Sequence, residues 1–362
     1  MSEARGGFAK FMAWVGIAAA LLSFGTAVHQ LVQAQGELRE NRRVVDEHLV
    51  TAQQHMKAGD YAAAWDNLQM AGTTAQLDGL FAKLLGGLSE ERQRVRTAQE
   101  DLAMQWLRDS RIKEGESFAE LSDKMVNVLA AGAASSDGSR KADLLAHLGW
   151  AYFLRHRSGD RNVKPEVTYR EAVASDAQNP YANVFWGHWI LWNRGPVREA
   201  NDRFAAALST DRARDQVRRF QLAAFTNNQS DEFKAGWLRV VDDMHARGEP
   251  ISPETWQRLY DLYYFSLNDP PLRGILQDAV APDRQIELQR SLLDSDALDP
   301  AERQVTRAIT ALTLEAAARQ HEALAAWQSL LDETRSDPRS TINARARTEI
   351  KRLSAGASAQ GQ

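Results

Sequence analysis

The densest group of aromatic side chains in the sequence is the segment Phe185-Trp186-Gly187-His188-Trp189-Ile190-Leu191-Trp192. Phe185, His188 and Trp192 are spaced so that they would share one face of a helix. Such a face, with an imidazole among aromatic rings, suits an apolar or aromatic segment of a peptide. Buried helices carry the same pattern, so the segment indicates either a peptide-binding face or part of the core.

The signatures of common catalytic sites do not occur in the sequence. The chain has no cysteine, which excludes a thiol nucleophile and a zinc–thiolate site. His321 and Glu322 begin an H-E-x-x-H zinc motif, but Ala325 stands where the second histidine belongs. No glycine-rich phosphate loop and no G-x-S-x-G nucleophile elbow occurs. We therefore expect a protein that is not an enzyme, with no catalytic residues, cofactor or metal.

Composition favours a helical protein without a nucleic-acid ligand. The formal net charge is −4 and the isoelectric point is near 6.1, so no global basic field would attract nucleic acid. Long runs with alternating Val, Ile and Thr are missing, and the ten prolines gather at turn positions. These features predict the all-α fold class.

One helical pattern occurs twice between residues 142 and 208. The first copy consists of Leu145, Leu148, Gly149, Tyr152, Tyr169, Ala172 and Pro180. The second copy consists of Phe185, Gly187, Ile190, Gly195, Ala200, Phe204 and Ala207. Small residues stand where two helices would touch, and large apolar residues stand where the pair would pack on a neighbour. This is typical of helical hairpins that bury their core only by stacking.

The pattern resembles the tetratricopeptide repeat (TPR), a 34-residue helix pair with the motif W-x2-L-G-x2-Y…A-x3-F-x2-A…P. Pro165 departs from it, because it stands where the motif has a small Ala. A weaker copy has a first helix at 46–58, followed by Gly59, Asp60, Tyr61, Ala64, Leu68 and Ala71. Another has a first helix at 305–317, followed by Ala323, Trp327 and Leu330. The resemblance implies TPR-like helical-hairpin repeats (an α-solenoid) in a bacterial membrane-anchored TPR-like protein.

The resemblance also implies a groove for a protein or peptide partner, because the first helix of each such repeat lines a concave surface. The residues placed there are His147, Trp150, Phe153, Phe185, His188 and Trp192. The alternative is that this aromatic set belongs to the core. A further aromatic set, at Trp256, Tyr260, Tyr263 and Tyr264, is expected to pack between helices.

A segment at 11–32 is expected to anchor the chain in a membrane. Residues 12–28 are almost wholly apolar, and about 20 such residues span a bilayer as a helix. A cleaved signal peptide is the alternative. Arg5 and Lys10 favour a cytoplasmic N-terminus, although Arg39, Arg42 and Arg43 follow the segment. With an alanine- and arginine-rich composition typical of GC-rich bacteria, we expect a single-pass inner-membrane protein whose bulk is periplasmic.

The expected organisation is an N-terminal tail (1–10), the transmembrane anchor or signal peptide (11–32), and an N-terminal helical region with one TPR-like hairpin (37–131). A linker of small and polar residues (132–140), the repeat domain (141–353) and a disordered tail (354–362) follow. The predicted function is a membrane-tethered scaffold or adaptor in bacterial envelope assembly or secretion. The alternatives are an exported small-ligand or glycan-binding protein and a regulatory subunit of an enzyme encoded elsewhere. Sequence leaves the oligomeric state open.

Overall fold

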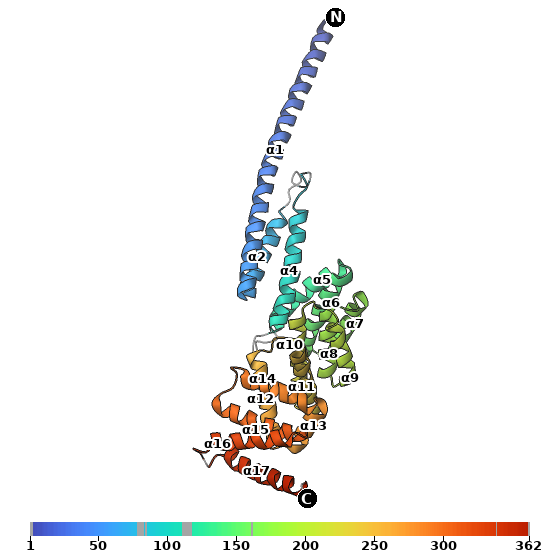
Figure 1. The fold of residues 1–362 in the computed structure, drawn as a ribbon. Coiled ribbons are helices and arrows are strands. Elements are labelled where there is room, and N and C mark those ends of the chain that lie inside the picture. The colour runs from blue at the N-terminus through green and yellow to red at the C-terminus, as the bar shows by residue number, and fades with distance from the viewer. Residues whose placement is uncertain are drawn as a thin grey trace. The chain divides into compact units, whose positions relative to one another are not determined.

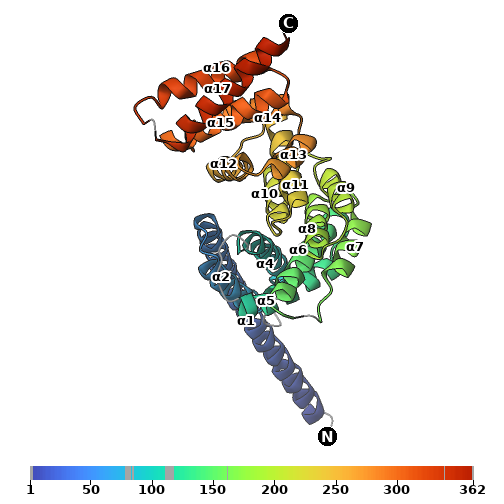
Figure 2. The ribbon, with the colours of Figure 1, turned by 90° about the horizontal axis from the view of Figure 1, so that it is seen from below.

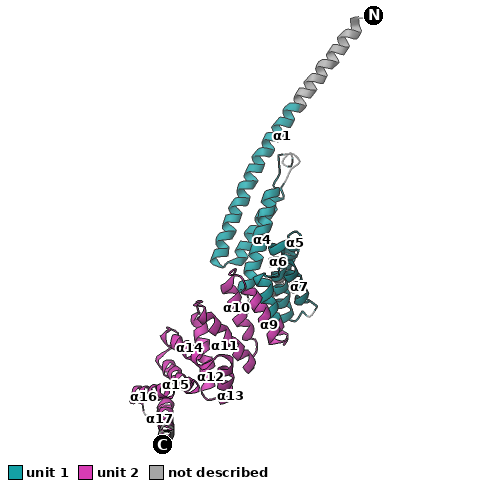
Figure 3. Cartoon of the chain, turned by 45° about the vertical axis from the view of Figure 1, so that its right-hand side comes forward, with its two compact units in different colours: residues 1–189 teal, residues 190–362 magenta. Residues whose placement is uncertain are grey.

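The computed structural model describes the backbone of residues 3–77, 83, 85–110, 118–160, 162–337 and 339–360. Their side chains are described too, except those at 3–23, 110, 118–122, 124 and 356–360. Helices joined by turns make up this part of the chain, without a strand, which confirms the predicted all-α class. Contacts divide the chain into two compact units, residues 1–189 and 190–362 (Figure 3).

Prolines and polar caps determine where several helices begin. Helices α12 (Pro253–Leu267), α13 (Pro270–Ala279) and α15 (Pro300–Ala316) each start with a proline. The first helical position suits proline, because its φ angle is already helical and its missing N–H is not needed there. The residues before these prolines accept a hydrogen bond from the first turn: Ser252, Asp269 and Asp299. These three prolines, which the sequence places at turns, are therefore helix starts.

Unit 1 begins with a hairpin of α1 (Glu3–Ala58) and α2 (Tyr61–Ala75) (Figure 1). Gly59 has a φ of +76°, a value that glycine adopts without strain, and it forms the turn with Asp60. The apolar side chains that the sequence places on α2, Ala64, Leu68 and Ala71, are buried. The rest of the unit consists of α4 (Ser89–Ser110), α5 (Phe118–Ala134), α6 (Gly138–Arg157), α7 (Pro165–Ser175) and α8 (Pro180–Trp192) as far as Trp189.

Helices α6 and α7 approach each other at Gly149, the small residue of the first pattern copy. A Cβ atom at Gly149 would lie 2.5 Å from Cε1 of Tyr169, closer than any real carbon contact. Tyr169 is fully buried, and burial raises the pKa of its hydroxyl well above the ordinary value. Glycine at this position thus lets the tyrosine ring lie directly on the neighbouring helix.

At 132–140, where the sequence predicts a linker, the structure has the end of one helix, a short non-helical connection at 135–137 and the start of the next helix. Helix α5 extends through Ala134 and α6 begins at Gly138. A Cβ atom at Gly132 would lie 2.6 Å from Oε1 of the buried Glu100, which accepts a hydrogen bond from Arg140 at 2.5 Å. The small residues therefore allow close helix packing, and the division between the two units lies instead after Trp189.

Unit 2 continues with helices after α8. They are α9 (Val197–Ala207), α10 (Arg214–Phe225), α11 (Asp231–Ala246), α12, α13, α14 (Pro282–Asp294), α15, α16 (Gln320–Glu333) and α17 (Thr341–Gln360). Helices α15, α16 and α17 lie side by side (Figure 2). Ala323, Trp327 and Leu330 of α16 are buried in this group, and Trp327 Nε1 donates to Glu315 Oε1 at 3.1 Å. The helix pair expected near 305–333 is therefore present.

Helix α1 contains the predicted membrane segment 11–32. Among the residues that the structure describes, no helix is long and apolar enough to cross a membrane. The side chains at 11–23, which make up most of the predicted anchor, lie outside the described residues, so the anchor remains a prediction. Side chains at 24–33 are exposed, and among the described side chains of α1 Ala34 is the first buried one.

The predicted disordered tail, 354–362, is helical as far as the structure describes it. Helix α17 extends to Gln360, and residues 361 and 362 lie outside the described residues. Alanine and glutamine are strong helix formers, so the end of α17 can continue into this small and polar segment.

The close approach at Gly149 leads to a stability prediction. Gly149→Ala should destabilise unit 1 by about 1–3 kcal/mol, because the new methyl group overlaps the Tyr169 ring. Gly36→Ala on α1 is the control, because nothing lies within 4 Å of its added methyl group. Alanine there should leave stability unchanged or raise it by up to about 1 kcal/mol. Urea unfolding followed by circular dichroism measures both; equal stabilities for the two variants would contradict the packing argument.

Candidate functional site

The aromatic and histidine residues of the predicted groove lie on two helices of unit 1. His147, Trp150 and Phe153 are on α6, while Phe185 and His188 are on α8. The Trp150 and Phe185 rings stack at 4.7 Å between centroids, and His188 meets the Trp150 ring edge-on at 5.2 Å. The sixth residue, Trp192, follows the division between the two units and is partly exposed. Five of the six predicted residues thus form one cluster.

This cluster is buried, which agrees with the core alternative that the sequence leaves open and not with an open groove. His147, Trp150, Phe185 and His188 have no exposed surface, and Phe153 is 1% exposed. The C-terminal end of α4 accounts for part of this burial. Trp150 Nε1 donates to the carbonyl oxygen of Leu107 at 3.2 Å. The chain's own helix therefore contacts the face that a partner peptide was expected to occupy.

Arg108 at the end of α4 makes two further contacts with the cluster. Its Nη1 lies 2.9 Å from Nε2 of His147, and its guanidinium carbon lies 5.1 Å from the centre of the Tyr181 ring. His147 Nδ1 lies 2.7 Å from the carbonyl oxygen of Asp143. A neutral imidazole protonated on Nδ1 satisfies both contacts, because it donates to Asp143 and accepts from Arg108. Both ring nitrogens of His147 therefore have hydrogen-bond partners within the chain, as is usual for a buried histidine.

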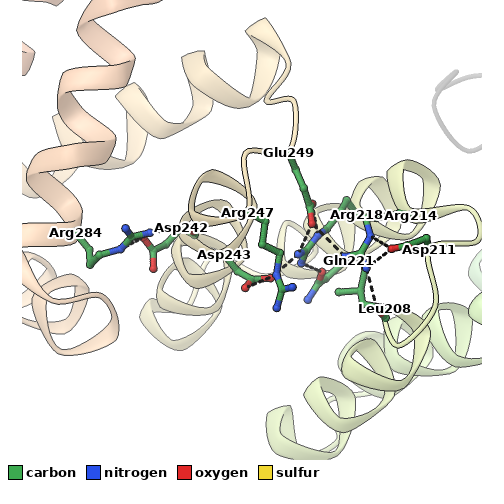
Figure 4. A network of polar contacts seen from close by, with 10 residues as sticks. All are labelled: Leu208, Asp211, Arg214, Arg218, Gln221, Asp242, Asp243, Arg247, Glu249 and Arg284. Carbon is green, nitrogen blue, oxygen red and sulfur yellow. Dashed lines mark hydrogen bonds and ion pairs between the residues drawn. The ribbon is translucent and has the colours of Figure 1, made fainter.

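In unit 2, a group of polar contacts surrounds Arg218 on α10 (Figure 4). This side chain is 3% exposed, and each of its three nitrogens donates a hydrogen bond. Nε donates to Glu249 Oε2 at 2.7 Å, Nη1 donates to Gln221 Oε1 at 3.1 Å, and Nη2 donates to both Glu249 and Asp243. Arg218 thereby joins α10 to α11 and to the loop that follows it.

The electrostatics of this group fit a structural role. Partial burial opposes ionisation of Asp243, but hydrogen bonds from Arg218 and Arg247 outweigh it and hold the pKa of this carboxyl below its ordinary value. Charges that are paired and hydrogen-bonded in this way are costly to break. A cavity of about 360 Å³ lies beside the group and is bordered by Arg218, Arg239 and Arg247. No aromatic ring lines it.

A second cleft of unit 2, here called the α11–α12 cleft, combines aromatic and charged side chains. It has a volume of about 240 Å³. Its walls come from the end of α10, from α11 and from α12, and its lining includes Phe225, Lys234, Trp237, Arg258, Asp261, Leu262 and Phe265. Phe265 at its edge is 65% exposed, and its neighbour Tyr264 is 48% exposed. The cleft thus has an aromatic side chain exposed at its edge.

Sequence reasoning did not find the α11–α12 cleft, because the region 211–300 shows no repeat motif. The aromatic set of α12 was expected to be core, and Tyr260 and Tyr263 are indeed buried, whereas Tyr264 is not. A signal was present in the positions of Arg258, Leu262 and Phe265, whose spacing of four and then three residues places them on one side of a helix. Helix α12 therefore carries exposed aromatic side chains, Tyr264 and Phe265, next to buried tyrosines.

Comparison of the sequence with protein-family models and with curated proteins finds no match. The TPR resemblance therefore remains an interpretation of the residues. In the described part of the chain, no group of three or more His, Asp or Glu residues is arranged to hold a metal ion.

The buried state of Trp150 gives a prediction that separates core from groove. Trp150→Ala should lower the unfolding free energy of unit 1 by about 3–5 kcal/mol, because it leaves a cavity among Phe153, Phe185 and His188. Val167→Ala, at a 49% exposed position on α7, is the control and should change stability by less than about 0.5 kcal/mol. Thermal and urea unfolding measure both. A folded, fully stable Trp150→Ala protein would favour an open groove.

The lowered pKa of Asp243 predicts acid sensitivity of unit 2. The carboxylate stabilises the fold fully above the pKa of an unfolded Asp, about 3.9, and this contribution is lost as pH falls through the lower pKa of the folded state. Asp243→Asn should be less stable at pH 7 and should lose less stability between pH 5 and pH 2. Asp296→Asn, at an exposed position before α15, should follow the unaltered protein. The midpoint urea concentration of unfolding, measured from pH 5 to pH 2, tests this prediction. The same pH dependence of the midpoint in Asp243→Asn and Asp296→Asn would contradict it.

Proposed function

We propose that this chain is a membrane-tethered helical scaffold that binds a protein partner through unit 2 and performs no catalysis itself. The observation that carries the proposal is the α11–α12 cleft with its exposed aromatic rim. Large aromatic side chains at the edge of a cleft are typical of protein-binding surfaces, where such residues contribute much of the binding energy.

The arrangement of helices supports a scaffold. Successive helices pair through close contacts such as Gly149 on Tyr169 in unit 1 and Gly236 on Phe225 in unit 2. Stacked helical hairpins have extended surfaces and commonly serve as binding platforms. The TPR-like organisation is part of this proposal. It differs from an open TPR groove because the residues of α6 and α8 that would line the groove are buried, in part by α4 of the same chain.

The tether rests on the sequence and on the continuity of α1. The apolar residues 11–23 belong to the same helix that reaches Ala58 in the folded part of unit 1. After them, Phe24, Val28, Leu31 and Val32 are apolar and exposed. Exposed apolar side chains next to an apolar segment are stable in lipid. The 22 residues at 11–32 would measure about 33 Å as a helix, close to the roughly 30 Å thickness of the hydrocarbon core of a bilayer. We place this segment in a bacterial inner membrane and the two units in the periplasm.

The glycan-binding alternative gains no support from the larger cavity. Sugars are commonly held on aromatic rings, and the 360 Å³ cavity has none in its lining. Its arginines are also engaged, Arg218 and Arg247 by Asp243 and Arg239 by the carbonyl oxygen of Ala279. A regulatory subunit would be a scaffold whose partner is an enzyme, and identification of the partner decides that question.

Site-specific photo-crosslinking in the producing bacterium tests the proposal. A benzophenone amino acid at position 265 should give a discrete crosslinked species, because this side chain is 65% exposed at the cleft. The same amino acid at position 167, which is 49% exposed on unit 1, should give none. The crosslinked species should sediment with membranes and be released by detergent and not by high salt.

A second change links the crosslink to the cleft. Trp237→Ala removes part of the cleft lining and should reduce the crosslink at position 265 at least fivefold. Position 265 failing to crosslink, or crosslinking to the same set of proteins as position 167, would refute partner binding at this site. A species that stays soluble after cell lysis would refute the tether while leaving the scaffold intact.

A further inference from the structure

The floor of the α11–α12 cleft is apolar and rigid. Phe225, Trp237 and Leu262 line it and are 3%, 4% and 8% exposed. Phe225 is held from below, because its ring contacts the Phe204 and Phe233 rings at centroid distances of 6.0 and 5.9 Å. A floor fixed in this way offers contact area without the entropy cost of ordering side chains on binding.

The volume of the cleft limits what it can hold. Pockets that enclose a drug-sized ligand or a cofactor measure about 300–1,000 Å³, whereas this cleft measures about 240 Å³. It is also open at the edge formed by the exposed Phe265. A cleft of this size and form suits one large side chain of a peptide that continues across the rim.

The charged side chains of the cleft are not balanced. Lys234 and Arg258 line it together with one carboxylate, that of Asp261, which gives a net charge of +1. The Lys234 ammonium is engaged by Asp231, with Nζ and Oδ1 2.9 Å apart. Arg258 makes no ion pair with a carboxylate of the described residues; its guanidinium carbon lies 5.8 Å from the centre of the Trp237 ring.

Arg258 is thus a solvent-exposed cation in the lining of the cleft, and the carboxylate that acts on it there is that of Asp261. Desolvation lowers the pKa of its guanidinium below the ordinary value, although the Asp261 carboxylate opposes this shift. The Trp237 ring orients the guanidinium by a cation–π contact, which leaves the N–H groups at its edge available for hydrogen bonds. A carboxylate suits this planar donor group better than any neutral acceptor does.

We propose that the α11–α12 cleft binds an acidic peptide segment of the partner protein. One large apolar side chain of the peptide lies on Trp237 and Leu262, and an adjacent Asp or Glu pairs with Arg258. This inference rests on the proposed scaffold function and specifies the chemistry of the segment that the scaffold recognises. The charge at position 258 then determines which peptides bind.

Selection from a phage-displayed library of random 12-residue peptides, with the full-length chain in detergent micelles, tests the proposal. The unaltered protein should enrich peptides with Asp or Glu next to Phe, Trp or Leu. Arg258→Glu should lose these peptides and enrich Lys or Arg at the acidic position. Arg258→Gln should lose the acidic preference without gaining a basic one. Synthetic copies of the enriched peptides should bind Arg258→Glu at least tenfold more weakly than the unaltered protein.

Arg335→Glu is the matched control, because this arginine is 82% exposed on unit 2 and does not line the cleft. Peptide affinity should change less than twofold there. Circular dichroism checks that each variant is folded, and Arg258→Gln keeps the test valid if the charge reversal alters the fold. Enrichment of the same peptides by the unaltered protein and Arg258→Glu, or no enrichment of acidic peptides, overturns the proposal.

The two proposals can fail separately. A crosslink at position 265 without an acidic preference in the selection would leave the scaffold in place and refute the acidic-peptide inference. Absence of both the crosslink and the enriched peptides would refute the proposed function itself.

Discussion

The contact of an aromatic ring with a glycine on the neighbouring helix is the constraint on which the packing of both units depends. Tyr169 lies on Gly149 in unit 1, and Phe225 lies on Gly236 in unit 2. In each case any side chain at the glycine would overlap the ring, so the distance between the two helices is fixed. Since Phe225 also lines the α11–α12 cleft, the same constraint that sets helix spacing in unit 2 shapes its candidate binding site.

Local patterns in the sequence predict helices and their pairs well when the signal lies within one hairpin. The turn at Gly59 and the spacing of Ala64, Leu68 and Ala71 locate the α1–α2 pair, because turn and apolar face are both encoded within about 30 residues. The helices between residues 211 and 300 have no repeat motif to identify them. Proline at the first helical position was the available signal there.

What covers a helix face could not be predicted in this way. Periodicity places His147 and Trp150 on one face of α6, but their partners Arg108 and Leu107 lie 39 and 43 positions earlier in the chain. Nothing in the spacing of an apolar face distinguishes a neighbouring helix from a partner protein as its cover. Spacing is equally ambiguous for α12, but there no helix of the described chain covers all the aromatic residues. Tyr264 and Phe265 remain exposed beside the buried Tyr263.

Energetics favours the α11–α12 cleft over the aromatic cluster as the place where a partner binds. A ligand for the cluster would first have to displace α4, breaking the Trp150–Leu107 hydrogen bond and the Arg108–His147 contact and exposing a fully buried indole. The binding energy would be reduced by the whole cost of that opening. In the cleft, Trp237 is already in place and Arg258 is already oriented. A carboxylate arriving there gains a charged hydrogen-bond donor without disrupting any contact of the fold.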